Sequence, residues 1–247
     1  MKEKNQAEGN QKTRMNILAI DSSDQVLSVA LEAESGIWHS EIDAGHRHSE
    51  FLMEAVNWLC CSAGLKALDL NMVACMKGPG SFTGLRIGFS AAKGLAMALG
   101  IPLVAVPTLD CLAYTFSHWP GIVLPVIDAK KGCFFCSFYR GGKRISDDMD
   151  ASPEIITNEI IKTRFFDEEP IIITGSGAEL LYSGLLKQLN PESLKIDLFF
   201  RKGRAKELLK MIKSGMINFV SSVNSAPVYL RKSDAELSRN WKQAEQK

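Results

Sequence analysis

The segment from Lys77 to Gly88 constrains the fold of this chain more than any other stretch, and it reads Lys-Gly-Pro-Gly-Ser-Phe-Thr-Gly-Leu-Arg-Ile-Gly. It follows a continuous apolar run, Met72 to Met76, which is typical of a strand buried on both faces. Its glycines permit backbone angles closed to other residues, Pro79 fixes one φ angle, and Ser81 or Thr83 can cap a helix that begins at once. The segment therefore predicts a strand, a tight turn and a helix, at the place where α/β proteins put ligand-facing loops.

This glycine turn is open to two interpretations. It is either a purely structural turn or a loop that holds an anion at a helix N-terminus. A Walker-type phosphate loop is excluded, because no Gly-Lys-Ser or Gly-Lys-Thr follows and the nearest lysine in the helix, Lys93, lies more than two turns inside it.

Composition limits the classes of function. The chain has 247 residues, 46% of them hydrophobic, which is enough for one large domain or two small ones with sizeable cores. A net charge of +1 argues against a surface that neutralises many phosphates by itself. Residues 1–14 are polar and predict a disordered tail rather than a signal peptide. No apolar run is long enough for a membrane span, so we expect a cytoplasmic protein without membrane contact.

Local spacing predicts no metal site. Most of the six cysteines fall in apolar segments, as small buried thiols do. Cys133 and Cys136 form a Cys-x-x-Cys, but their aromatic, strand-like surroundings make a redox or zinc role the minor alternative. The four histidines contain no pair at the spacing that places two imidazoles on one helical face. We expect neither a metal nor a cofactor in the isolated chain.

Hydrophobic periodicity predicts two similar halves, each of β-β-β-α-β-α order. The expected strands are 16–20, 27–31, one from about 37, 72–76, 103–106, 122–127, 133–139 and 171–174. The expected helices are 49–63 with Ser49 as cap, 83–99, 153–165, one after Gly177, and 202–214.

The predicted fold class is α/β, of the two-lobed actin, hexokinase and Hsp70 type (the ASKHA fold). We place the boundary near Pro107, so that residues 15–106 form an N-terminal lobe and residues 107–247 a smaller C-terminal lobe. The last segments, 202–214 and 227–231, are expected to pack back across the join.

Four segments resemble the TsaB family, once called YeaZ: Ile17–Ser23, Gly78–Gly88, Ile127–Ala129 and Pro227–Arg231. The resemblance covers nearly the whole chain after Arg14. It implies a subunit that helps its paralogue TsaD to place a threonylcarbamoyl group on N6 of adenosine 37 in tRNAs reading codons that begin with A. The implied partners are TsaD, the ATPase TsaE, which would use ATP with magnesium at the complex, and a second copy of the chain when TsaD is absent. It implies tRNA contact only through the complex.

The same resemblance implies that the chain is not itself the enzyme. In TsaD and its relatives, a metal-binding Asn-His-x-x-x-His follows a Pro-Leu-Val-x-Val strand. Here Pro102–Val106 is followed by Pro107, with Thr108 and Leu112 at the two histidine positions. Neither side chain can replace an imidazole ligand.

A partner surface is expected on the helices 49–63 and 83–99, since apolar residues surround the axis of the first and a mixed stripe follows the second. The predicted interface residues are Phe51, Leu52, Ala55, Val56, Leu59, Arg86, Phe89, Ser90, Lys93 and Met97. Leu52→Glu or Phe89→Glu would then leave a folded monomer that no longer binds TsaD. The alternative is that these helices simply pack tightly within the monomer.

Weaker features suggest ligands. Asp21, Ser22 and Ser23 stand where actin-like enzymes hold a phosphate and magnesium, although an acid that caps a turn is equally expected. With Asp128 as base, an ATP-dependent phosphotransferase is the alternative function. The glycine turn Ile173–Gly177 could be a second phosphate loop or a plain turn. Basic residues that could reach tRNA are Arg201, Lys202, Arg204, Lys206, Arg231, Lys232, Arg239 and Lys242.

Overall fold

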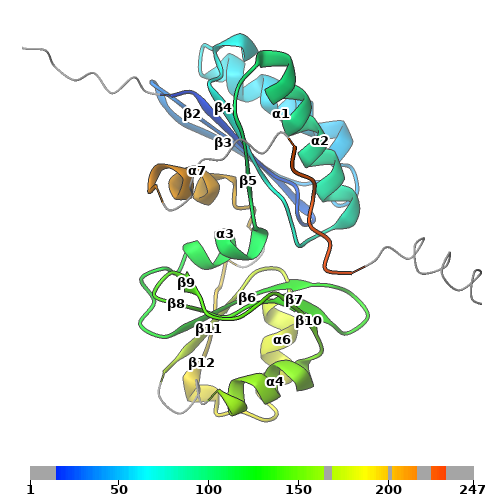
Figure 1. The fold of residues 1–247 in the computed structure, drawn as a ribbon, viewed down its shortest axis with the longest axis vertical. Coiled ribbons are helices and arrows are strands. Elements are labelled where there is room, and N and C mark those ends of the chain that lie inside the picture. Colours follow the sequence, from blue (N-terminus) through cyan, green and yellow to red (C-terminus); the bar gives the residue numbers. More distant parts are fainter. Residues whose placement is uncertain (1–14, 164–168, 200–201, 216–223, 232–247) are drawn as a thin grey trace, which may run out of the picture.

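The computed structural model describes residues 15–163, 169–199, 202–215 and 224–231, which form two α/β lobes (Figure 1). The predicted tail, residues 1–14, lies outside this range, as do Arg201, Lys232, Arg239 and Lys242 among the basic residues. Two sheets with helices on both faces confirm the predicted two-lobed fold class.

The first lobe contains a five-stranded sheet in the order β3-β2-β1-β4-β5. Its elements are β1 (Ile17–Asp21), β2 (Val26–Ala33), β3 (Gly36–Asp43), α1 (His48–Ser62), β4 (Met72–Met76), α2 (Phe82–Leu99) and β5 (Leu103–Val106). β1, β4 and β5 run parallel, whereas β2 is antiparallel to both β1 and β3. Every residue of β1 and β4 is buried, as the continuous apolar run predicted.

Each face of this first sheet has its own cover, because alternate strand residues point to opposite faces. On one face, Leu18 and Val73 belong to a core that α1 and α2 complete. On the other face, Ala19 and Ala74 pack with α7 (Ala205–Lys213), a helix that arrives late in the sequence. The helix α3 (Thr108–Tyr114) contributes Cys111 to that same core.

The second lobe is built on β6 and β11, with sheet order β10-β7-β6-β11-β12 and β8 paired to β6 and β9. Its elements are β6 (Ile122–Asp128), β7 (Phe134–Cys136), β8 (Tyr139–Arg140), β9 (Lys143–Arg144), β10 (Met149–Ala151), α4 (Pro153–Lys162), β11 (Ile171–Thr174), α6 (Ala178–Leu185) and β12 (Leu194–Ile196). α4 and α6 cover one face of this sheet. α3 covers the other with Leu109 and Leu112, so α3 lies between the two sheets (Figure 1).

Several predicted boundaries are corrected. α1 begins at His48 after Arg47, and no side chain caps it, so Ser49 as its cap was wrong. The cap of α2 is confirmed, because Ser81 Oγ accepts a hydrogen bond from Gly84 N at 3.3 Å. The predicted strand 133–139 is two short strands, β7 and β8, and the sequence analysis missed α3, β9, β10 and β12. α7 begins at Ala205 rather than at 202.

Candidate functional site

The glycine turn is a packing junction. An added Cβ on Gly84 would lie 2.1 Å from the carbonyl oxygen of Ser22, and one on Gly80 would lie 2.5 Å from that of Ser23. At Gly88 the nearest atom would be Ser22 Oγ at 2.0 Å. These distances are far below any real Cβ contact, so the glycines let α2 lie directly against the turn that follows β1. This geometry favours the structural interpretation over an anion loop.

The polar groups of the turn after β1 form hydrogen bonds within the fold. Ser22 Oγ donates to Gly84 O at 2.9 Å, and Ser23 O accepts from Ser81 N at 2.7 Å. Both serines are buried. Ser22 and Ser23, predicted as nucleotide ligands, thus use their polar atoms to join β1 to the start of α2.

Asp21 lies at the centre of this junction and is 4% exposed. One carboxylate oxygen accepts from Ser23 N at 3.0 Å and from Ser23 Oγ at 2.6 Å. The other accepts from Arg204 N at 2.8 Å. Burial raises the pKa of Asp21, while the hydrogen bonds from Ser23 and Arg204 lower it in part. Of the two interpretations left open for Asp21, the structure shows the capped turn, and the same carboxylate also holds the backbone that enters α7.

Arg204 extends this network into the second lobe. Its guanidinium donates to Asp197 Oδ2 at 3.0 Å. Arg204, Asp197 and the neighbouring Thr174 are all buried. Thr174 Oγ1 also donates to Asp197 Oδ2 at 2.7 Å. The glycine turn that contains Thr174 is closely packed as well, because a Cβ on Gly175 would lie 2.3 Å from the carbonyl of Val126. A second phosphate loop finds no support in this arrangement.

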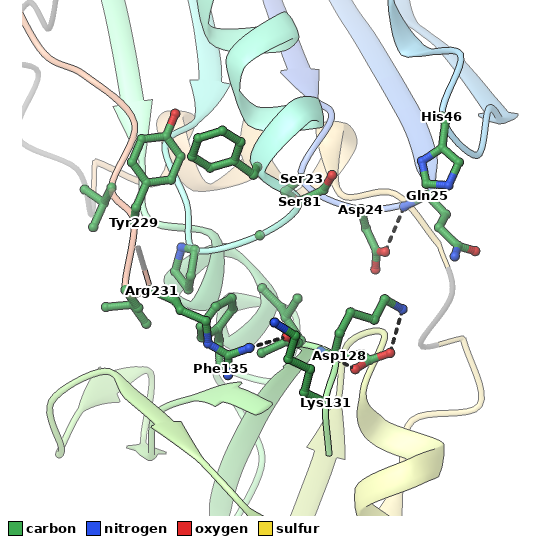
Figure 2. Close-up of a pocket in the computed structure, with 18 of the residues that line it drawn as sticks. Ser23, Asp24, Gln25, His46, Ser81, Asp128, Lys131, Phe135, Tyr229 and Arg231 are labelled. Carbon is green, nitrogen blue, oxygen red and sulfur yellow. Dashed lines mark hydrogen bonds and ion pairs between the residues drawn. The ribbon is translucent and has the colours of Figure 1, made fainter. Parts of the chain in front are cut away.

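An open cleft of about 410 Å³ lies between the lobes, at the carboxyl ends of β1, β4 and β6. Figure 2 shows Ser23, Asp24 and Ser81 on one side of it and Asp128, Lys131 and Phe135 on the other. Its lining is completed by the C-terminal segment Val228–Arg231, which the sequence analysis expected to pack back across the join but did not predict as part of a cleft.

Charges in the cleft are largely paired within the chain. Asp128 Oδ2 accepts from Lys130 Nζ at 2.7 Å, and Arg231 pairs with Asp150. Lys130 and Lys131 have φ angles of 62° and 58°, in the left-handed region that favours glycine. Asp128 is therefore an ion-paired turn residue rather than a free base.

The predicted partner surface must be redrawn. Four of its α1 residues are buried in the first lobe's own core, namely Leu52, Ala55, Val56 and Leu59, and Phe51 packs against that core. Phe89 of α2 is also buried there, at 4% exposure. A charge at Leu52 or Phe89 would disrupt this core, so the structure leads us to expect that these two variants lose stability rather than remain folded monomers.

The outward side of the two helices keeps the predicted residues Arg86, Ser90, Lys93 and Met97 and adds Met53 and Trp58, which were not predicted. We call it the helical face and define it by Met53 and Trp58 of α1 and Arg86, Ser90, Lys93 and Met97 of α2. Trp58 is 54% exposed and Met97 62%, although both are large and apolar. Sequence reasoning missed Met53 and Trp58 as surface residues. The available signal was that both are out of phase with the buried Leu52 and Leu59, which lie seven positions apart on one side of α1, so that Met53 and Trp58 flank this buried stripe from its two sides.

Thr108 and Leu112, at the two positions compared with the metal-binding histidines, lie buried on α3. Among the described residues, no cluster of three or more histidine, cysteine or acidic side chains could hold a metal ion. The described part of the chain also contains no helix with the length and apolar character needed to cross a membrane.

Comparison with known proteins identifies the family. A family model described as "TsaD: tRNA N6-adenosine threonylcarbamoyltransferase" matches residues 36–236. The Bacillus subtilis (strain 168) "tRNA threonylcarbamoyladenosine biosynthesis protein TsaB" is 31% identical over 167 residues, which are 67% of this chain and 73% of that protein. The chain belongs to the TsaB family. The TsaB protein of Escherichia coli (strain K12) is 31% identical over 153 residues, 61% of this chain and 66% of its own.

A solved TsaB-family structure supports the same assignment. "YeaZ from Pseudomonas aeruginosa" superposes with a TM-score of 0.71 at 25% identity, over 88% of this chain and 100% of that one. The predicted family and fold are thereby confirmed.

Proposed function

We propose that this chain is a non-catalytic subunit of the system that makes threonylcarbamoyladenosine in tRNA, and that it acts by binding a TsaD-type transferase. The named TsaB relatives place their own proteins in this pathway. The observation that carries the binding role is the helical face, where the large apolar side chains of Met53, Trp58 and Met97 remain exposed on α1 and α2. Large apolar side chains grouped on one surface are typical of a protein interface.

The assignment as a non-catalytic subunit rests on the donor set of the chain. Thr108 and Leu112 offer no imidazole, and both carboxylate oxygens of Asp21 are hydrogen-bonded within the fold. The phosphotransferase alternative has equally little support, because its proposed base, Asp128, is paired with Lys130. Catalysis would then belong to the partner, with the ATPase TsaE and tRNA engaging the assembled pair. A homodimer over the same helical face is expected when TsaD is absent, in the cytoplasm, where tRNA is modified.

Association with TsaD tests this proposal. Trp58→Glu or Met97→Glu should weaken the binding of purified TsaD by about 100-fold, because each places a carboxylate in an apolar interface core. The matched control is Ile155→Glu on α4, where an isoleucine is 53% exposed on the other lobe. Binding can be measured by sedimentation velocity or by calorimetry. Equal weakening by all three variants, or by none, would contradict the proposed interface.

A further inference from the structure

A C-terminal segment, residues 224–231, crosses from one lobe to the other (Figure 1, red). At the first lobe, Val228 N donates to Lys77 O at 2.6 Å, next to the glycine turn. The Tyr229 ring lies 4.7 Å from the ring of Phe82 between centroids, and Tyr229 Oη accepts from Arg86 Nε at 3.2 Å. This end is thus fastened to the first turns of α2, the helix that carries four of the six residues of the helical face.

The other end of the segment is fastened to the second lobe. Arg231 makes a two-pronged ion pair with Asp150 of β10, with Nε to Oδ2 at 2.7 Å and Nη2 to Oδ1 at 2.5 Å. Its third nitrogen, Nη1, donates to Ala129 O at 2.8 Å, in the turn after β6. Both charged side chains are about three-quarters shielded from solvent. Two parallel hydrogen bonds from a planar guanidinium fork to a carboxylate fix the orientation of the two side chains as well as the distance between them.

The segment also fits the turn below it closely. A Cβ on Gly78 would lie 2.4 Å from the carbonyl oxygen of Val228, and the φ angle of Gly78 is +106°. Arg86 stacks over Phe82 at 3.7 Å and so joins Tyr229 in one cluster of two rings and a cation. Only two residues lie between Val228, which contacts Lys77, and Arg231, which pairs with Asp150, so the segment can lengthen very little between the two attachments.

We propose that residues 224–231 form an interlobe clamp that couples the helical face to the position of the second lobe. The clamp lies over the cleft, which Val228, Tyr229, Leu230 and Arg231 help to line (Figure 2). Release at Arg231 loosens the second lobe at this edge of the cleft, and Tyr229, no longer held from that side, then shifts the position of Arg86 on α2. The coupling to a partner rests on the proposed function, whereas the clamp between lobes does not.

Hydrogen–deuterium exchange of the whole chain tests the clamp without any partner. Arg231→Ala should raise the rate of amide exchange about fivefold in both turns that the segment joins, 78–81 and 129–133. The reason is that local opening of the two turns is coupled through the segment that connects them. Arg231→Lys, which keeps the charge but loses the fork, should give the same pattern at smaller amplitude. The control is Arg140→Ala, which breaks an ion pair to Glu169 within the second lobe. Faster exchange confined to 129–133 would overturn the clamp.

Partner binding tests the coupling. Arg231 lies on the second lobe and outside the helical face, yet Arg231→Ala should change the Kd for TsaD by about threefold or more, a size usual for coupled sites. An unchanged Kd, together with exchange that rises in both turns, would overturn the coupling and keep the clamp. If the unmodified chain fails to bind TsaD, the proposed function fails instead, and the exchange result still decides the clamp.

Discussion

Gly84→Ala is expected to destabilise the protein by about 3 kcal/mol, since overpacking of this kind cannot be relieved by moving a flexible side chain. The new Cβ would lie 2.1 Å from a backbone oxygen, that of Ser22, and the Ser22 turn is itself held by hydrogen bonds. Relief would require α2 to move away from β1 and would break the contact of Ser22 Oγ with Gly84 O. Chemical denaturation with urea measures the change in the free energy of unfolding.

The same helix offers a matched control. Gly94 is exposed, and a Cβ there would meet nothing within 4 Å. Gly94→Ala should therefore stabilise the protein by about 0.5 to 1 kcal/mol, through the higher helix propensity of alanine. If Gly84→Ala also proved neutral or stabilising, the close junction between the glycine turn and the Ser22 turn would not exist in solution.

Local patterns predicted this junction's elements well. The apolar run Met72–Met76, the glycines and Ser81 act over a few residues, so the buried strand, the turn and the capped helix could all be predicted. What the glycines approach could not be predicted, because the neighbouring turn at Ser22 lies 62 positions earlier in the chain than Gly84. A glycine is needed here because another part of the backbone lies too close for a Cβ atom, and sequence spacing does not identify that neighbouring backbone.

The inward face of the helices was harder to predict than their existence. α1 has apolar residues on all sides, so periodicity alone does not fix which side meets the sheet. The structure buries Leu52 and Leu59 and leaves Trp58 in solvent. In α2 the sheet contacts Phe89, which had been assigned to the outer stripe. The resemblance selected the correct pair of helices, but the residues that face outward depend on the sheet.

Removal of the Asp21 carboxylate should destabilise the protein by about 3 kcal/mol, the cost of leaving several buried donors without a partner. In Asp21→Ala, the amides of Ser23 and Arg204 and the hydroxyl of Ser23 lose their common acceptor. Arg204 lies 183 positions from Asp21, which is why its contact could not be inferred from the sequence. The free energy of unfolding measures this loss, and the control is Asp24→Ala, three positions further along the chain and not a hydrogen-bond partner of Arg204.

Asp21→Asn separates shape from hydrogen bonding and predicts a dependence on pH. Its amide group must turn an N–H toward either Ser23 or Arg204 N, so one buried donor faces another at a cost of about 1 to 3 kcal/mol.

Because burial raises the pKa of Asp21 in the folded protein, the folded state holds the proton of this carboxyl group more tightly than the unfolded chain does. The contribution of this protonation to the free energy of unfolding is therefore fully present below the unfolded pKa of about 3.9, and it is lost as the pH rises through the folded pKa. The difference in the free energy of unfolding between the unmodified chain and Asp21→Asn should thus be larger at pH 4 than at pH 7. A difference that shrinks on acidification would show instead that the fold stabilises the ionised carboxylate of Asp21.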